Sequence, residues 1–185
     1  MNHRVIFPDP DIWTQPKEHH MTYADQPNAA DARRAAALTI HHRRGNNAGV
    51  LALLAETGET TRAAELVLAI LDLHRSAIME LKTEAGIELM AQYVQALATL
   101  PIPVNPDTEG ADVSRAAQLL DAHGRGDTDA INHALQSAAT AGRPAELVLA
   151  LLDLFDHLIA ELSCEAGIDW LQRCITSFAT EENQR

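Results

Sequence analysis

Two pairs of carboxylates at matched spacing are the first residues of this chain that could carry chemistry. Glu65 and Asp72 lie seven residues apart, and Glu146 and Asp153 repeat that spacing. On a helix this spacing places both carboxylates on one face, where they can bind a metal ion or transfer protons. The face continues with small and polar residues, and His157 follows Asp153 at a local ion-pair spacing. We therefore expect a solvated stripe here, and keep Asp153 and His157 as candidate binding residues.

A compact basic cluster, His41–Arg44, is the second candidate. A phosphate group or an acidic protein could dock on such a cluster. Basic residues are also favoured at the C-terminus of a helix, where they interact with the negative end of the helix dipole. We favour the helix-end interpretation, and His42, Arg43 and Arg44 are the candidate residues for an anion or acidic-protein surface.

An N-terminal arm rich in proline is the third candidate. It places Ile6, Phe7, Ile12 and Trp13 in a stiff segment around two prolines. Such a segment can dock into the groove of a partner with little loss of entropy. It can equally pack over the core of its own chain, which is the interpretation we favour, and the four apolar residues are candidate binding residues.

Sequence signatures of catalysis and metal binding are missing. The nine histidines form no His-Glu-x-x-His motif, and Cys164 and Cys174 lack Cys-x-x-Cys spacing. The two cysteines are expected to be small buried hydrophobes, and His74 is expected at the boundary of the core. No nucleophile elbow, phosphate-binding loop or dinucleotide fingerprint is present. We predict no catalytic residue, no metal site and no cofactor, so the protein is expected not to be an enzyme.

The elements that must position these residues are duplicated within the chain. Residues 30–99 align without a gap on residues 111–180, with 29 identities in 70 positions at an offset of 81. A match of this length indicates a tandem duplication of one structural unit. An arm (1–29), a proline-rich linker (100–110) and a polar tail (181–185) lie outside the two units.

Each unit is predicted to form four helices. In the first unit they cover about residues 30–43, 47–56, 60–82 and 87–98, and the third helix is apolar around most of its circumference. Gly58 is expected to end the second helix, whereas Gly86 fits either the end of the third helix or the start of the fourth. Alternating strand patterns are absent. The predicted fold is all-α, with two units of about 70 residues packed as a pseudo-twofold helical bundle, because one such unit would be marginally stable alone.

Charge and composition exclude several classes of protein. The 185 residues carry a net charge of −12, which disfavours nonspecific binding to nucleic acid or to anionic membranes. The two units differ, with a net charge of −1 for residues 30–99 and −6 for residues 111–180. No apolar run reaches the length of a membrane helix, no secretion leader is recognisable, and cysteines are few. We expect a cytoplasmic protein without nucleic-acid or membrane partners.

The helical pattern of both units resembles small Ala/Leu-rich helical modules of actinobacteria and their phages. The resemblance is carried by Leu38–Gly45 with Leu66–Leu81, and by Leu119–Gly126 with Leu147–Leu162. It implies a helical fold and brings no activity or site residue with it.

The predicted function is that of a protein-interaction module, acting as a regulator or adaptor of phage or host. The two units keep the same core and differ in surface, which indicates that they face different partners. The alternative is a sensor that binds a small apolar ligand between helices or at the seam between the units. The molecule is expected to be a pseudo-twofold monomer or a homodimer that binds a protein partner.

Overall fold

The computed structural model describes residues 26–60, 62–100 and 108–184. Within these ranges the chain forms eight α-helices and one short 3₁₀ helix, and contains no strand. The all-α prediction is confirmed. None of the described helices combines the length and the apolar character needed to cross a membrane.

The first half of the chain, residues 26–100, forms four helices, α1 (Ala29–Arg43), α2 (Asn47–Glu59), α3 (Ala63–Leu81) and α4 (Glu84–Ala98). The prediction that Gly58 ends the second helix is wrong, because α2 continues to Glu59 and Gly58 is buried in its last turn. Beside it, the Thr57 hydroxyl donates to the carbonyl of Leu53, so the last turn of α2 is held by burial and hydrogen bonding.

The second half, residues 108–184, forms α5 (Glu109–Arg125), α6 (Thr128–Thr140), α7 (Pro144–Leu158), the 3₁₀ helix η3 (Ala160–Ser163) and α8 (Glu165–Glu182). Thr108 caps α5 by accepting from the backbone N–H of Ala111. Most of the predicted linker 100–110 lies outside the described residues.

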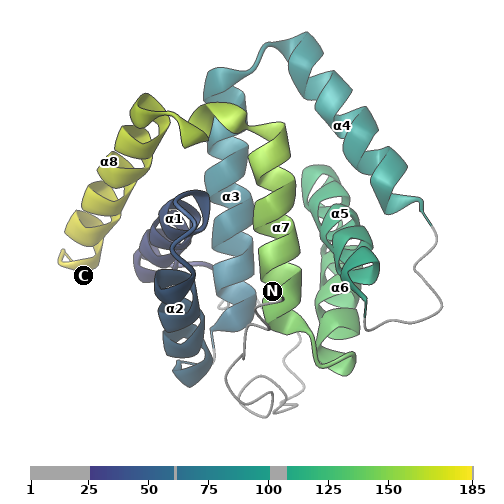
Figure 1. Cartoon of the computed structure of the whole chain (residues 1–185), viewed down its shortest axis with the longest axis horizontal. Helices are drawn as coiled ribbons and strands as arrows, with labels where there is room; N and C mark the ends of the chain where they lie inside the picture. The colour runs from purple at the N-terminus through teal and green to yellow at the C-terminus, as the bar shows by residue number, and fades with distance from the viewer. Residues whose placement is uncertain (1–25, 61, 101–107, 185) are drawn as a thin grey trace, which may run out of the picture.

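The fourth helix of each half packs on the first helix of the other half. Helix α8 lies along α1, and α4 lies along α5. In Figure 1, α3 and α7 stand side by side in the centre, with α1, α2 and α8 on one side and α4, α5 and α6 on the other. The two halves therefore share their outer layers, and neither half encloses its own first helix without the other.

The core is built around α3 and α7, as expected from their apolar circumference. Both helices bury aliphatic side chains on several faces, including Leu66, Ile70, Leu147 and Leu151. The ring of His74 on α3 stacks on the ring of Phe155 on α7, with centroids 3.9 Å apart. His74 is fully buried, so its predicted place at the core boundary is wrong. The flat stack against Phe155 explains why an imidazole is accommodated at this depth.

Gly86 and Gly167 occupy the first turns of α4 and α8, which answers the question that the sequence left open for Gly86. A Cβ on Gly86 would meet only ordinary contacts, whereas a Cβ on Gly167 would lie 2.4 Å from the carbonyl oxygen of Glu161. Glycine at 167 therefore lets α8 start in close contact with η3.

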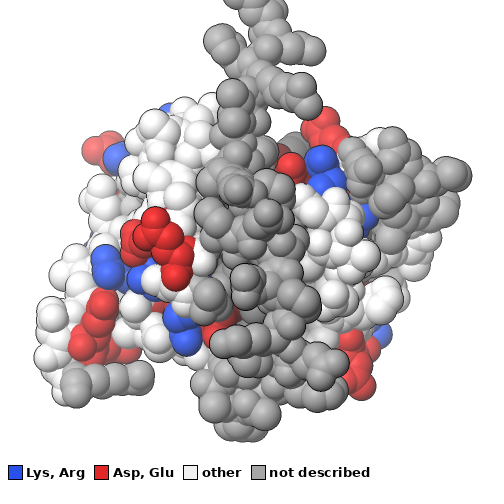
Figure 2. All heavy atoms as spheres, turned by 90° about the horizontal axis from the view of Figure 1, so that it is seen from below, with Lys and Arg blue, Asp and Glu red and all other residues white. Residues whose placement is uncertain are grey.

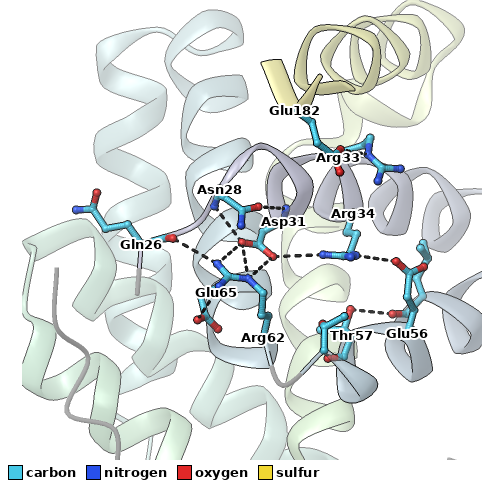
Figure 3. A network of polar contacts seen from close by, with 12 residues as sticks. Gln26, Asn28, Asp31, Arg33, Arg34, Glu56, Thr57, Arg62, Glu65 and Glu182 are labelled. Carbon is cyan, nitrogen blue, oxygen red and sulfur yellow. Dashed lines mark hydrogen bonds and ion pairs between the residues drawn. The ribbon is translucent and has the colours of Figure 1, made fainter. Parts of the chain in front are cut away.

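A buried carboxylate at the start of α1 ties this helix to α3 (Figure 3). The Asp31 side chain is 1% exposed and accepts from the guanidinium of Arg62, with an Arg62 Nη2 to Oδ2 distance of 2.7 Å. It also accepts from the backbone N–H of Asn28, whose own side chain accepts from the N–H of Asp31. Asp31 thus completes a capping box and an ion pair between helices.

The second half repeats this arrangement. Asp112 on α5 accepts from Arg143 at the start of α7, with an Nη2 to Oδ2 distance of 2.6 Å, and pairs with Arg115 on its own helix at 3.0 Å. Asp112 and Arg115 are both buried. Seen from below (Figure 2), the described acidic and basic side chains lie beside one another in small mixed groups.

We predict that Asp112→Ala lowers the free energy of unfolding by about 3 kcal/mol, because it removes the buried carboxylate that pairs with Arg115 and Arg143. Urea unfolding followed by circular dichroism measures the change. Glu182→Gln is the control, because the Arg33–Glu182 pair is exposed and should cost less than about 1 kcal/mol. Equal losses in the two variants would contradict the structural role of Asp112.

Candidate functional site

The most concentrated group of ionisable side chains lies where α1 of the first half meets α7 of the second. His42 Nε2 lies 3.1 Å from Asp153 Oδ1, and His42 Nδ1 lies 3.3 Å from Asp156 Oδ2. Arg43 Nη2 lies 3.1 Å from the other oxygen of Asp156, Oδ1. We call these four residues the seam cluster.

The positions of these side chains follow from the two helices that carry them. His42 and Arg43 form the last turn of α1, while Asp153 and Asp156 are three residues apart on one face of α7. The Arg43 side chain is 1% exposed. It also donates to the carbonyl of Phe155 at 3.2 Å and to the hydroxyl of Ser163 at 2.7 Å. Arg43 therefore anchors the end of α1 to both α7 and η3.

Within the seam cluster, the charged forms of His42 and Asp156 are stabilised. Contact with Asp156 raises the pKa of His42 above its ordinary value, even though partial burial works in the opposite direction. Partial burial would raise the pKa of Asp156, but the contact with His42 and the charge of Arg43 outweigh it and lower that pKa. The cluster is thus a network of opposite charges that joins the two halves.

A second, simpler contact lies at positions offset by 81 residues from His42 and Asp153. His123 on α5 places Nε2 3.0 Å from Asp72 Oδ1 on α3. His42 and His123 are 81 residues apart, as are Asp72 and Asp153. The other two positions differ, because Arg75 stands at the position of Asp156 and a glycine at the position of Arg43. The second contact therefore has one carboxylate where the seam cluster has two.

Three of the residues singled out from the sequence come together in the seam cluster, namely His42, Arg43 and Asp153. Arg44 caps α1 and is exposed. His157 is exposed, and its Nδ1 lies 2.7 Å from the backbone carbonyl of Asp153. The four residues of the N-terminal arm lie outside the described residues, namely Ile6, Phe7, Ile12 and Trp13.

The sequence analysis did not identify Asp156, and two of its other expectations are wrong. Asp156 follows Asp153 at i+3, so it shares a helix face with that residue, and this spacing is the signal that could have identified it. The expected solvated stripe is interrupted, because Ala69 and Ala150 are buried. Cys164 is exposed, so the expectation that it is buried is wrong.

His74 lies behind the seam cluster and is buried in a neutral form. Burial is the main cause that lowers its pKa to about 4, and the nearby charge of Arg43 acts in the same direction. Its Nδ1 lies 2.8 Å from the carbonyl of Ile70, which assigns the proton to Nδ1. In the described part of the chain, Nε2 has no hydrogen-bond partner.

An exposed apolar stripe on α4 is the second candidate site. Leu89 is 68% exposed and Tyr93 is 48% exposed. Ala85 and Ala96 are also exposed and lie at helical spacing on the same face, so we call these four residues the α4 stripe. The opposite face of α4 carries Val94, which is buried. Helix α4 therefore has two apolar faces, of which the one with Val94 is buried in the fold and the one with Leu89 and Tyr93 is exposed.

Comparison with known proteins adds no further constraint on either site. No protein-family model, curated protein or solved structure matches this chain.

We predict that His74→Phe removes part of the acid sensitivity of the fold. Because the folded state keeps His74 neutral down to a pKa of about 4, protonation of this residue favours the unfolded chain as the pH falls below about 6.5. The wild type should lose up to about 3 kcal/mol by this route near pH 4, whereas the variant should not. Phenylalanine suits the site because Phe155 occupies the equivalent position.

Urea unfolding of both proteins at pH 7 and near pH 4.5 measures this difference. Since Arg43, His42 and Asp156 stay in place in the variant, their own titration contributes to both proteins. An identical dependence of stability on pH in the two proteins would rule out His74 as the cause.

Proposed function

We propose that this protein is a non-enzymatic helical interaction module, a regulator or adaptor that binds an amphipathic helix of a partner protein along the α4 stripe. The observation that carries the proposal is the exposure of Leu89 and Tyr93 on one face of a helix whose opposite face already packs in the fold. Two large apolar side chains one turn apart, flanked by exposed alanines, match the spacing by which helices dock in grooves.

Burial of this stripe would provide a favourable free energy of binding. A fully buried leucine contributes about 2 kcal/mol relative to an exposed one, and a tyrosine contributes apolar area together with a hydroxyl that can remain hydrated. Single exposed apolar residues are common on protein surfaces, but an aligned set on one helix face is typical of an interaction site.

The charges around the stripe favour a basic partner. The charged residues of α4 are Glu84 and Glu88, and the helix contains no lysine or arginine. The whole chain carries a net charge of −12. A partner helix with an apolar face and basic flanks would be attracted to this surface, whereas a second copy of the chain would be repelled by its like charge.

The two halves are related in sequence, but only the first half offers the proposed docking face. We infer that the halves are copies of one unit packed as a pseudo-twofold pair, because equivalent helices pack reciprocally and the pairs His42–Asp153 and His123–Asp72 occupy equivalent positions. The fourth helices have diverged. At the position of Leu89, α8 carries Trp170, which is partly buried and donates its indole N–H to Glu80 at 2.9 Å.

A synthetic helical peptide of about 18 residues, with leucines on one face and lysines on its flanks, tests the proposal. We predict that it binds the full chain and that Leu89→Ser/Tyr93→Ser weakens its affinity by roughly tenfold or more. Fluorescence anisotropy of the labelled peptide measures binding. Circular dichroism confirms that the variant keeps its helical content.

Two controls separate docking on the stripe from general attraction to an acidic protein. Gln172→Ser/Thr176→Ser changes two exposed residues of α8 and should leave the affinity unchanged. A peptide of the same composition with its leucines and lysines scrambled should bind more weakly. Equal binding by the wild type and Leu89→Ser/Tyr93→Ser would overturn the proposal, as would self-association through α4 in light-scattering measurements.

A further inference from the structure

We propose that His42, Asp153 and Asp156 form a binding site for a first-row divalent transition-metal ion at the seam between the two halves. This inference is independent of helix docking on α4. One imidazole nitrogen and two carboxylate oxygens, one from each residue, lie within 4.8 Å of one another. The ion would link α1 of the first half to α7 of the second.

The geometry is close to what such an ion requires. Two ligands of a tetrahedral zinc ion, each bound at about 2.1 Å, lie about 3.4 Å apart. His42 Nε2 and Asp153 Oδ1 are separated by 3.1 Å, and His42 Nδ1 and Asp156 Oδ2 by 3.3 Å. These two distances involve different nitrogens of the ring, and an ion would bind only one of them. One ring nitrogen and one oxygen of each carboxylate lie within 4.8 Å of one another, so side-chain rotation would have to bring them around a common centre.

Hydrogen bonding in and around the seam cluster is incomplete. Within the described residues, three enclosed side-chain nitrogens lack a hydrogen-bond partner, namely His42 Nδ1, Arg43 Nε and His74 Nε2. Two of them belong to the seam cluster, and the third belongs to the fully buried His74. His42 Nδ1 faces Asp156 Oδ2 at 3.3 Å without the geometry of a hydrogen bond. It is the one of the three that could bind an ion in the seam cluster, because Arg43 Nε carries a hydrogen on a cationic group.

Arg43 prepares Asp156 for the role of a ligand. Its guanidinium lies 3.1 Å from Oδ1 of Asp156 and leaves Oδ2 directed toward His42. Partners of this kind orient ligating carboxylates in metal sites. Asp153 is 64% exposed, so an ion can approach from solvent on that side.

The donor set selects among ions. A mixed set of one imidazole and two carboxylates suits zinc and its first-row neighbours. Magnesium and calcium prefer oxygen ligands only and should bind more weakly. Zinc is therefore the probe ion, and magnesium is its comparison.

The repeat supplies a matched control within the same chain. His123 and Asp72 reproduce the contact between His42 and Asp153, but Arg75 brings a positive charge where Asp156 brings a carboxylate. The second contact should therefore not hold the ion. Replacing Arg75 by aspartate should create there the donor set of the seam cluster.

Isothermal titration of the full chain with Zn²⁺ tests the proposal. We predict that Asp156→Asn weakens the seam-site affinity at least tenfold, that Asp72→Asn leaves it unchanged, and that Arg75→Asp adds one further zinc ion per chain. Zn²⁺ should also raise the Tm of the wild type but not that of Asp156→Asn, because a ligand stabilises the state that binds it.

Circular dichroism without metal shows whether each variant folds. Should Asp156→Asn fail to fold, His42→Gln serves in its place with the same expected loss of affinity. Zinc binding elsewhere, for example at other histidines, would appear as equal affinity in the wild type and in both seam variants, and would overturn the proposal. Absence of zinc binding to the wild type, or equal binding of Mg²⁺ and Zn²⁺, would also overturn it.

Discussion

The fourth helix of each half packs on the first helix of the other half, and the rest of the structure depends on this reciprocal packing. Helix α8 covers α1, and α4 covers α5, while α3 and α7 meet in the centre through the stacked rings of His74 and Phe155. An alanine-rich unit of about 70 residues with few aromatic side chains buries too little apolar surface to be stable alone. Sharing the outer layers joins both units into one core, and the capping carboxylates Asp31 and Asp112 fix the first helix of each unit on its third.

The positions of the candidate sites follow from this reciprocal packing of the two halves. Because the halves meet along α1 and α7, the end of α1 brings His42 and Arg43 onto carboxylates that lie more than a hundred residues away in the chain. The equivalent contact between His123 and Asp72 shows the same geometry with different neighbours. Sequence differences between the two halves then set the chemistry of each contact. They place Asp156 in one contact and Arg75 in the other, and they leave the α4 stripe exposed on one fourth helix.

The helices and the two central elements could be predicted from the sequence, because helical periodicity and terminus signals act over a few residues. Contacts between residues that are far apart in the chain could not be predicted in this way. The pairing of Asp31 with Arg62 depends on the packing of α1 on α3, and no local pattern reports it. His74 aligns with Phe155, a packed aromatic, and this alignment is the signal in the sequence that both residues lie in the core. Asp156 was missed because the repeat has arginine there, so comparison of the two units gave no signal.

Native-state hydrogen exchange of the intact chain in rising urea tests the central claim most directly. It measures, helix by helix, the free energy at which each segment opens. If the halves complete each other, the slowest-exchanging amides of α1 and α3 in the first half and of α5 and α7 in the second should converge on one common opening free energy, that of global unfolding. Opening of one half at low urea, while the other half keeps its full protection, would show two independent units and contradict the account.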